Sequence, residues 1–170
     1  MVITMEKYTL SVLVENSAGV LSRVVGLFTR RGFNIHSLSV GPTYDEQISR
    51  ITIEVKGDAY MVEQVSKQLS KIMEVIKIKI LKDNEMVKRG IVLVKIKTNT
   101  KNRGEIIEVA NVFRANIIDI SPTTVTAEVT GSDQKIEAFL NMVESYGIEE
   151  LARSGMTALE RGANTLKPDK

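Results

Sequence analysis

The 170-residue sequence contains no cysteine and a single histidine, His36. Without cysteine the chain can form neither disulfide bonds nor thiolate sites, which fits a reducing cytoplasm. One histidine excludes a metal site built from several imidazoles. His36 stands beside Ser37 in a predicted strand, where we interpret it as a structural or surface histidine. We therefore expect this chain to hold neither catalytic residues nor metal ligands.

Long apolar runs and blocks of one charge are also absent. No apolar run approaches the roughly 18 residues that a membrane span needs, and the N-terminus lacks the basic and apolar regions of a secretory signal. The 23 Lys and Arg residues are offset by 21 Asp and Glu residues, for a net charge of +2. Basic residues alternate with acidic ones, so we expect a cytoplasmic protein with no membrane segment and no nucleic-acid partner.

The first half of the chain alternates between two hydrophobic periods. Apolar residues recur at every second position in strands and at helical spacing in helices. We expect helices after Gly19, ending at Arg31 before Gly32, and after the capping residue Asp58. The predicted strands are 8–14, 34–40, 50–55 and 76–80.

The second half repeats this order after the polar break 83–85. We expect helices over 104–115 and after the capping residue Ser132, and a frayed tail after Gly162. The predicted strands are 92–97, 117–120, 125–129 and 148–152, the last one weakened by Glu149 and Glu150. The fold class is thus α+β, with two tandem ferredoxin-like βαββαβ domains at 1–83 and 84–170. Small domains bury little core, so we expect a homodimer.

The most informative stretch is the turn from Asn16 to Gly19, which leads from a strand into an amphipathic helix. A helix N-terminus offers unpaired N–H groups and roughly half a positive charge, so it suits a small anion such as a carboxylate. Gly19 lets a ligand approach the backbone, and the Asn16 amide can both donate and accept hydrogen bonds. These groups are suited to binding a free amino acid. Structural alternatives are that Asn16 caps the helix or is only a turn residue, that Gly19 serves close packing and that Asn34 tolerates a left-handed turn.

The residues also resemble a known family. The stretches 16–28 (Asn-Ser-Ala-Gly-Val-Leu-Ser-Arg-Val-Val-Gly-Leu-Phe) and 31–38 (Arg-Gly-Phe-Asn-Ile-His-Ser-Leu) are similar to the opening of the small regulatory subunit of acetolactate synthase, also called acetohydroxyacid synthase. Residues 85–97, 113–119 and 152–155 resemble the C-terminal half of that family. The resemblance covers about Tyr8 to Gly162.

This resemblance implies that residues 1–83 form an ACT domain for effector binding and dimerisation, and that 84–170 contact the catalytic subunit. The chain would have no active site and no cofactor, because thiamine diphosphate, Mg and FAD are expected on the catalytic subunit. It would activate that subunit and mediate feedback inhibition by a branched-chain amino acid, usually valine, bound between two ACT domains. The implied effector-binding residues are Asn16, Gly19, Val20, Leu21, Asn34 and Ile35. Ser17 and Ala18 depart from the family, which often has a larger or acidic residue there.

Two other functions are weighed against this one. A free-standing amino-acid-sensing ACT protein with a different output would fit the same turn, but no DNA-binding segment is recognisable. A small enzyme on a ferredoxin-like scaffold is disfavoured, because no convergent catalytic cluster is visible.

Overall fold

The computed structural model describes residues 6–168, which form two units. One unit consists of the chain up to Val87 together with the residues from Gly155 onward, and the other of Lys88–Ser154. Each unit is described by itself. Within residues 6–168, none of the helices combines the length and the apolar character that a membrane crossing requires.

The first unit has the predicted βαββαβ order. Its elements are β1 (Glu6–Glu15), α1 (Val20–Arg30), β2 (Ile35–Pro42), β3 (Ile48–Gly57), α2 (Ala59–Leu69) and β4 (Val75–Leu81). The sheet has the order β2-β3-β1-β4, and all its neighbouring strands are antiparallel. Two predicted helix signals are confirmed. Gly32 adopts a φ of 67° just after α1, and the Asp58 side chain accepts a hydrogen bond from the Met61 N–H at the start of α2.

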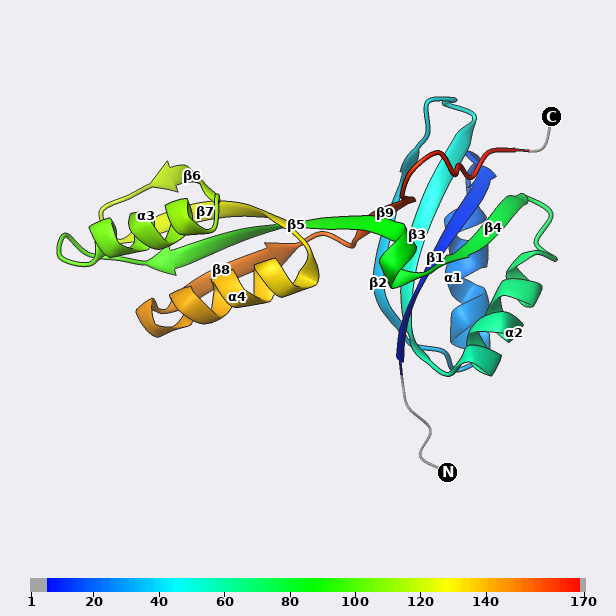
Figure 1. Cartoon of the computed structure of the whole chain (residues 1–170), viewed down its shortest axis with the longest axis horizontal. Coiled ribbons are helices and arrows are strands. Elements are labelled where there is room, and N and C mark those ends of the chain that lie inside the picture. Colours follow the sequence, from blue (N-terminus) through cyan, green and yellow to red (C-terminus); the bar gives the residue numbers. More distant parts are fainter. Residues whose placement is uncertain (1–5, 169–170) are drawn as a thin grey trace. The chain divides into compact units, whose positions relative to one another are not determined.

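The core of the first unit lies between the sheet and its two helices, which Figure 1 shows together on one side of the strands. Alternate residues of β1 and β3 supply the sheet side of this core, and one apolar face of each helix supplies the other side. Its buried members include Leu10, Val12, Val14, Val24, Phe28, Ile51, Ile53, Val62, Val65 and Leu69. The period-2 and helical patterns of the sequence therefore predicted the core face correctly.

The second unit repeats the order. It contains the greater part of β5 (Met86–Lys97), which begins in the first unit after a short 3₁₀ helix (Asp83–Glu85), followed by α3 (Arg103–Val112), β6 (Asn116–Ile120), β7 (Thr124–Gly131), α4 (Asp133–Val143) and β8 (Ile148–Arg153). The strand order β6-β7-β5-β8 corresponds to that of the first sheet. Ser132 caps α4 as expected, because its hydroxyl accepts a hydrogen bond from the Lys135 N–H. The strand at 148–152 is confirmed despite its two glutamates.

The C-terminal end of the chain corrects two expectations. The tail that was predicted to fray after Gly162 is packed at its buried Leu166, and residues 155–168 belong to the first unit rather than to a domain spanning 84–170. They include a short strand, β9 (Thr157–Glu160), which pairs with β5. Met156, Ala158 and Leu166 are buried, and Ser37 and Ser39 of β2 hydrogen-bond to the backbone of Met156. The physical reason is that helices cover only one face of the first sheet, and the C-terminal segment covers the other.

Candidate functional site

The turn from β1 into α1 is the centre of the candidate site. Gly19 is the N-cap residue and has a left-handed φ of 84°, a conformation that residues with a Cβ rarely adopt. Within the described residues no side chain caps α1, so the proposed capping role of Asn16 is wrong. The backbone N–H of Val20 makes a long bond of 3.4 Å to the Ser17 carbonyl, and within the described chain no protein acceptor is assigned to the N–H groups of Leu21 and Ser22. The first turn contains no acidic residue, so its partial positive charge is not neutralised locally.

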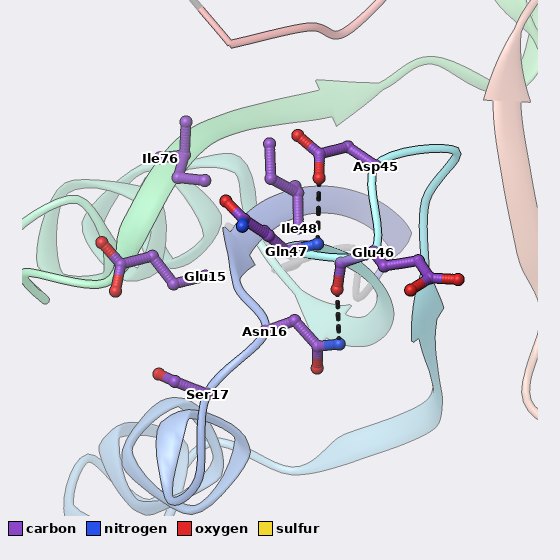
Figure 2. A pocket seen from close by; sticks show the side chains of 8 residues that line it. All are labelled: Glu15, Asn16, Ser17, Asp45, Glu46, Gln47, Ile48 and Ile76. Carbon is purple, nitrogen blue, oxygen red and sulfur yellow. Dashed lines mark hydrogen bonds between the residues drawn. The ribbon is translucent and has the colours of Figure 1, made fainter.

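Asn16 is held against the hairpin between β2 and β3. Its backbone N–H donates to the Gln47 carbonyl at 2.7 Å, and its Nδ2 donates to the Glu46 carbonyl at 2.8 Å. Figure 2 shows this second bond and the Oδ1 of Asn16 pointing away from it. Because Nδ2 already donates to the Glu46 carbonyl in this orientation of the amide, Oδ1 remains available to accept a hydrogen bond from a ligand.

A pocket of about 560 Å³ lies beside Asn16 (Figure 2). Its lining carries carboxylates but no basic side chain, so it favours a positively charged group. The lining residues are Glu15, Asn16, Ser17, Asp45, Glu46, Gln47, Ile48 and Ile76. The hairpin residues were not predicted as part of the site. The pairing of Glu15 with Ile48 brings them there, and only a correct strand register could have revealed this.

The other predicted site residues are divided between this end of the unit and the opposite one. Leu21 is 38% exposed on α1, but the side chain of Val20 is 2% exposed and packs in the core. Asn34 is exposed, and Ile35 begins β2 and packs against the core. Asn34 does not occupy a left-handed turn, because Arg114 is the only non-glycine residue with positive φ in the described part of the chain.

Strand register shows that Asn34 and Ile35 lie far from Asn16. Ile35 pairs with Val55, which pairs with Tyr8 near the beginning of β1, whereas Asn16 follows the end of β1. The seven residue-to-residue steps from Tyr8 to Glu15 span roughly 23 Å of strand. One copy of the chain therefore brings Asn16, Gly19 and Leu21 together but does not bring Asn34 and Ile35 to them.

The fold agrees with comparisons to known proteins. Residues 10–77 match the family described as the AHAS small subunit-like ACT domain, and residues 89–162 match the family described as the small subunit of acetolactate synthase. The first unit is thus an ACT domain on a ferredoxin-like fold.

Similar proteins extend this match over nearly the whole chain. The probable acetolactate synthase small subunit of Archaeoglobus fulgidus is 49% identical over 92% of this chain and 98% of its own length. The corresponding protein of Methanothermobacter thermautotrophicus is 47% identical, with 95% and 96% covered. The crystal structure of the small subunit from Thermotoga maritima superposes with a TM-score of 0.87 at 37% identity, covering 94% of this chain and 99% of that one. The chain belongs to the family of acetolactate synthase small subunits, and the resemblance predicted from its sequence is confirmed.

Proposed function

We propose that the chain is a non-catalytic regulatory subunit that binds the catalytic subunit of acetolactate synthase, raises its activity and mediates inhibition by valine or another branched-chain amino acid. The observation that carries this proposal is the 49% identity to a small subunit over 92% of the chain. The reaction, with thiamine diphosphate, Mg and FAD, is assigned to the catalytic subunit. We place the contact with that subunit on the second unit, whose helices expose Val112 and Met142, because exposed apolar side chains mark interaction surfaces.

The turn before α1 offers complementary partners to the two charged ends of an amino acid. The effector's carboxylate would accept hydrogen bonds from the N–H groups of Leu21 and Ser22 at the positive end of α1. Its ammonium would donate to Oδ1 of Asn16 and face the carboxylates of the neighbouring pocket. Leu21 would supply an apolar wall for the branched side chain.

We propose that a second copy of the chain supplies Asn34 and Ile35. β2 is an edge strand, so it can pair with β2 of another copy. In a two-fold antiparallel pairing, the beginning of β2 in one copy lies beside the end of β2 in the other. That end carries Pro42, which pairs with Ser49 next to the Glu15–Ile48 pair. Asn34 of one copy would thereby reach the Asn16 turn of the other, and the predicted residues other than the core side chain of Val20 would form one composite site.

Reconstitution tests the regulatory role. Acetolactate formation by the matching catalytic subunit is measured alone, with the chain, and with the chain plus valine, leucine or isoleucine. We expect a higher rate with the chain and a lower one after the effector is added. If the chain changes neither the rate nor the response to any of the three amino acids, the proposed function is wrong.

Mixing two variants tests the composite site. Asn16→Ala and Asn34→Ala should each abolish effector binding in their own dimers. In a heterodimer of the two variants, one site carries both changes and the other carries none. Random reassortment should therefore restore about a quarter of the binding sites, which titration calorimetry can count. If mixing restores no binding, the two residues do not come from different copies.

A further inference from the structure

The second face of the first sheet carries several buried polar residues. Residues that alternate with the core positions of β1 and β3 point to this face, and Thr9, Ser11, Thr52 and Glu54 are at most 2% exposed there. The C-terminal residues 155–168 belong to the same unit, and their Leu166 carbonyl accepts a hydrogen bond from Nη2 of Arg50. A layer with these buried polar residues thus lies between the sheet and the C-terminal segment, beside an apolar cluster of Leu81, Met86 and Ala158.

A cavity of about 260 Å³ opens at one end of this layer, between β2, β3 and β9. Hydroxyl groups of Ser39, Thr43, Thr52 and Thr157 belong to its lining residues, and Arg50 is the lining residue with a formal charge. Among the residues that the structure describes, none of those lining the cavity carries a carboxylate. Its volume suits a small molecule, since a water molecule occupies about 30 Å³ of the liquid.

Thr52 and Arg50 have hydrogen-bonding capacity that the protein does not use. Thr52 is 2% exposed, and within residues 6–168 its hydroxyl is assigned no hydrogen-bond partner. Arg50 donates from Nη1 to the Ser11 hydroxyl and from Nη2 to the Leu166 carbonyl, both at 3.2 Å. A guanidinium has five N–H groups, so further donors remain for a ligand.

The charge balance around Arg50 favours an anion. Burial lowers the pKa of Arg50 and the nearby Glu160 opposes this shift, but an arginine side chain remains protonated at neutral pH. Glu160 is itself paired with Lys79 at 2.7 Å. The excess charge beside the cavity is therefore the positive charge of Arg50.

We propose that this cavity binds a small oxyanion, a carboxylate or a phosphate, through the Arg50 guanidinium and the Thr52 hydroxyl. The site is separate from the effector site proposed at Asn16 and does not depend on it. Because Thr157 lines the cavity and Leu166 is bonded to Arg50, the anion binds only while the C-terminal segment lies on the sheet. By linkage, bound anion stabilises that docked arrangement.

Titration calorimetry of the full-length chain at constant ionic strength tests the site, with inorganic phosphate and acetate as separate probes. We expect saturable binding of at least one probe, and the one that binds distinguishes phosphate from carboxylate recognition. Thr52→Val, which keeps the shape but removes the hydroxyl, and Arg50→Gln should each weaken binding about tenfold or more. Thr126→Val, at a half-buried threonine in β7 of the second sheet, is the matched control and should have no effect.

Hydrogen exchange provides the second readout. Saturating probe should slow amide exchange over residues 157–166 in the native chain and not in Thr52→Val. Gly19→Asp should leave anion binding intact, which separates this site from the effector site. Absence of binding by both probes, or binding that Thr52→Val leaves unchanged, would overturn the proposal. Arg50→Gln can loosen the C-terminal segment, so Thr52→Val is the deciding variant.

Discussion

The two units share one strand and helix order but differ at the turn into their first helix. In the second unit, the Asn99 and Asn102 side chains accept hydrogen bonds from backbone N–H groups of the turn itself. Glu105 also places an acid in the first turn of α3. In the first unit, Asn16 reaches across to the hairpin and α1 has no acid in its first turn. The first turn is therefore suited to an external anion, whereas the second opposes one.

The second faces of the two sheets also differ. In the first unit this face carries several buried polar residues and is covered by the C-terminal segment. In the second unit, Ile91 and Leu93 of β5 remain 38% exposed, and all residues of β8 are exposed. The same fold therefore acquires different surfaces according to which face is covered, and binding sites follow those surfaces rather than the strand order.

The largest effect on effector binding should come from placing an aspartate at the start of α1, compared with the same substitution at the start of α3. Gly19→Asp should weaken effector binding roughly a hundredfold or more, because it adds a carboxylate where the effector's carboxylate is expected. Gly104→Asp places the same charge in the first turn of α3, where a Cβ meets nothing within 4 Å, and should leave effector binding unchanged. Titration calorimetry with valine measures both.

Gly19→Ala separates charge from backbone strain in this comparison. The left-handed φ of Gly19 strains any residue with a Cβ, at a cost of roughly 1–2 kcal/mol. We expect Gly19→Ala to retain measurable binding that Gly19→Asp loses. If both glycine sites respond equally to aspartate, the first turn has no special role.

A smaller effect should come from a glycine at the start of the C-terminal segment. A Cβ at Gly155 would collide with the backbone of Leu38, so Gly155→Ala should displace this segment from the first sheet. Overpacking of this kind costs about 1–3 kcal/mol. Gly41→Ala, where a Cβ meets nothing within 4 Å, is the control. Urea denaturation and tryptic cleavage near Arg161 measure the loss, and equal behaviour of the two variants would contradict a packed segment.

Strands, helices and cores could be predicted because each depends on local periodicity. The alternate spacing of Leu10, Val12 and Val14 predicts a core face of a strand. Asp58 and Ser132 are typical capping residues, and each predicts the start of the helix that follows it. The C-terminal segment that covers the first sheet, residues 155–168, could not be predicted in this way. β9 has four residues, of which only Ala158 is buried, and Ala158 packs against Leu81 and Met86 from distant parts of the sequence, so no local apolar pattern marks the contact.

The sequence identifies the turn at the centre of the candidate site but not the arrangement of the residues around it. Asn16 and Gly19 are close in sequence and remain close in the fold. Asn34 is separated from them by α1, which spans the unit and carries the chain to the other end of the sheet before β2 begins. Sequence distance does not reveal this, because it depends on the direction in which β2 runs beside β3.

The smallest effect, a change in the unfolding free energy, should come from removing one ion pair on the second face of each sheet. Lys79 and Lys95 are similarly exposed, at 44% and 41%, but their partners Glu160 and Glu150 are 7% and 72% exposed. Lys79→Met leaves a buried carboxylate without its cation and should cost about 1 kcal/mol. Lys95→Met removes a surface pair and should change the unfolding free energy by less than about 0.5 kcal/mol. Denaturant unfolding of both variants at low and high salt measures the difference. Equal losses would mean that the C-terminal segment does not shield Glu160 from water in solution.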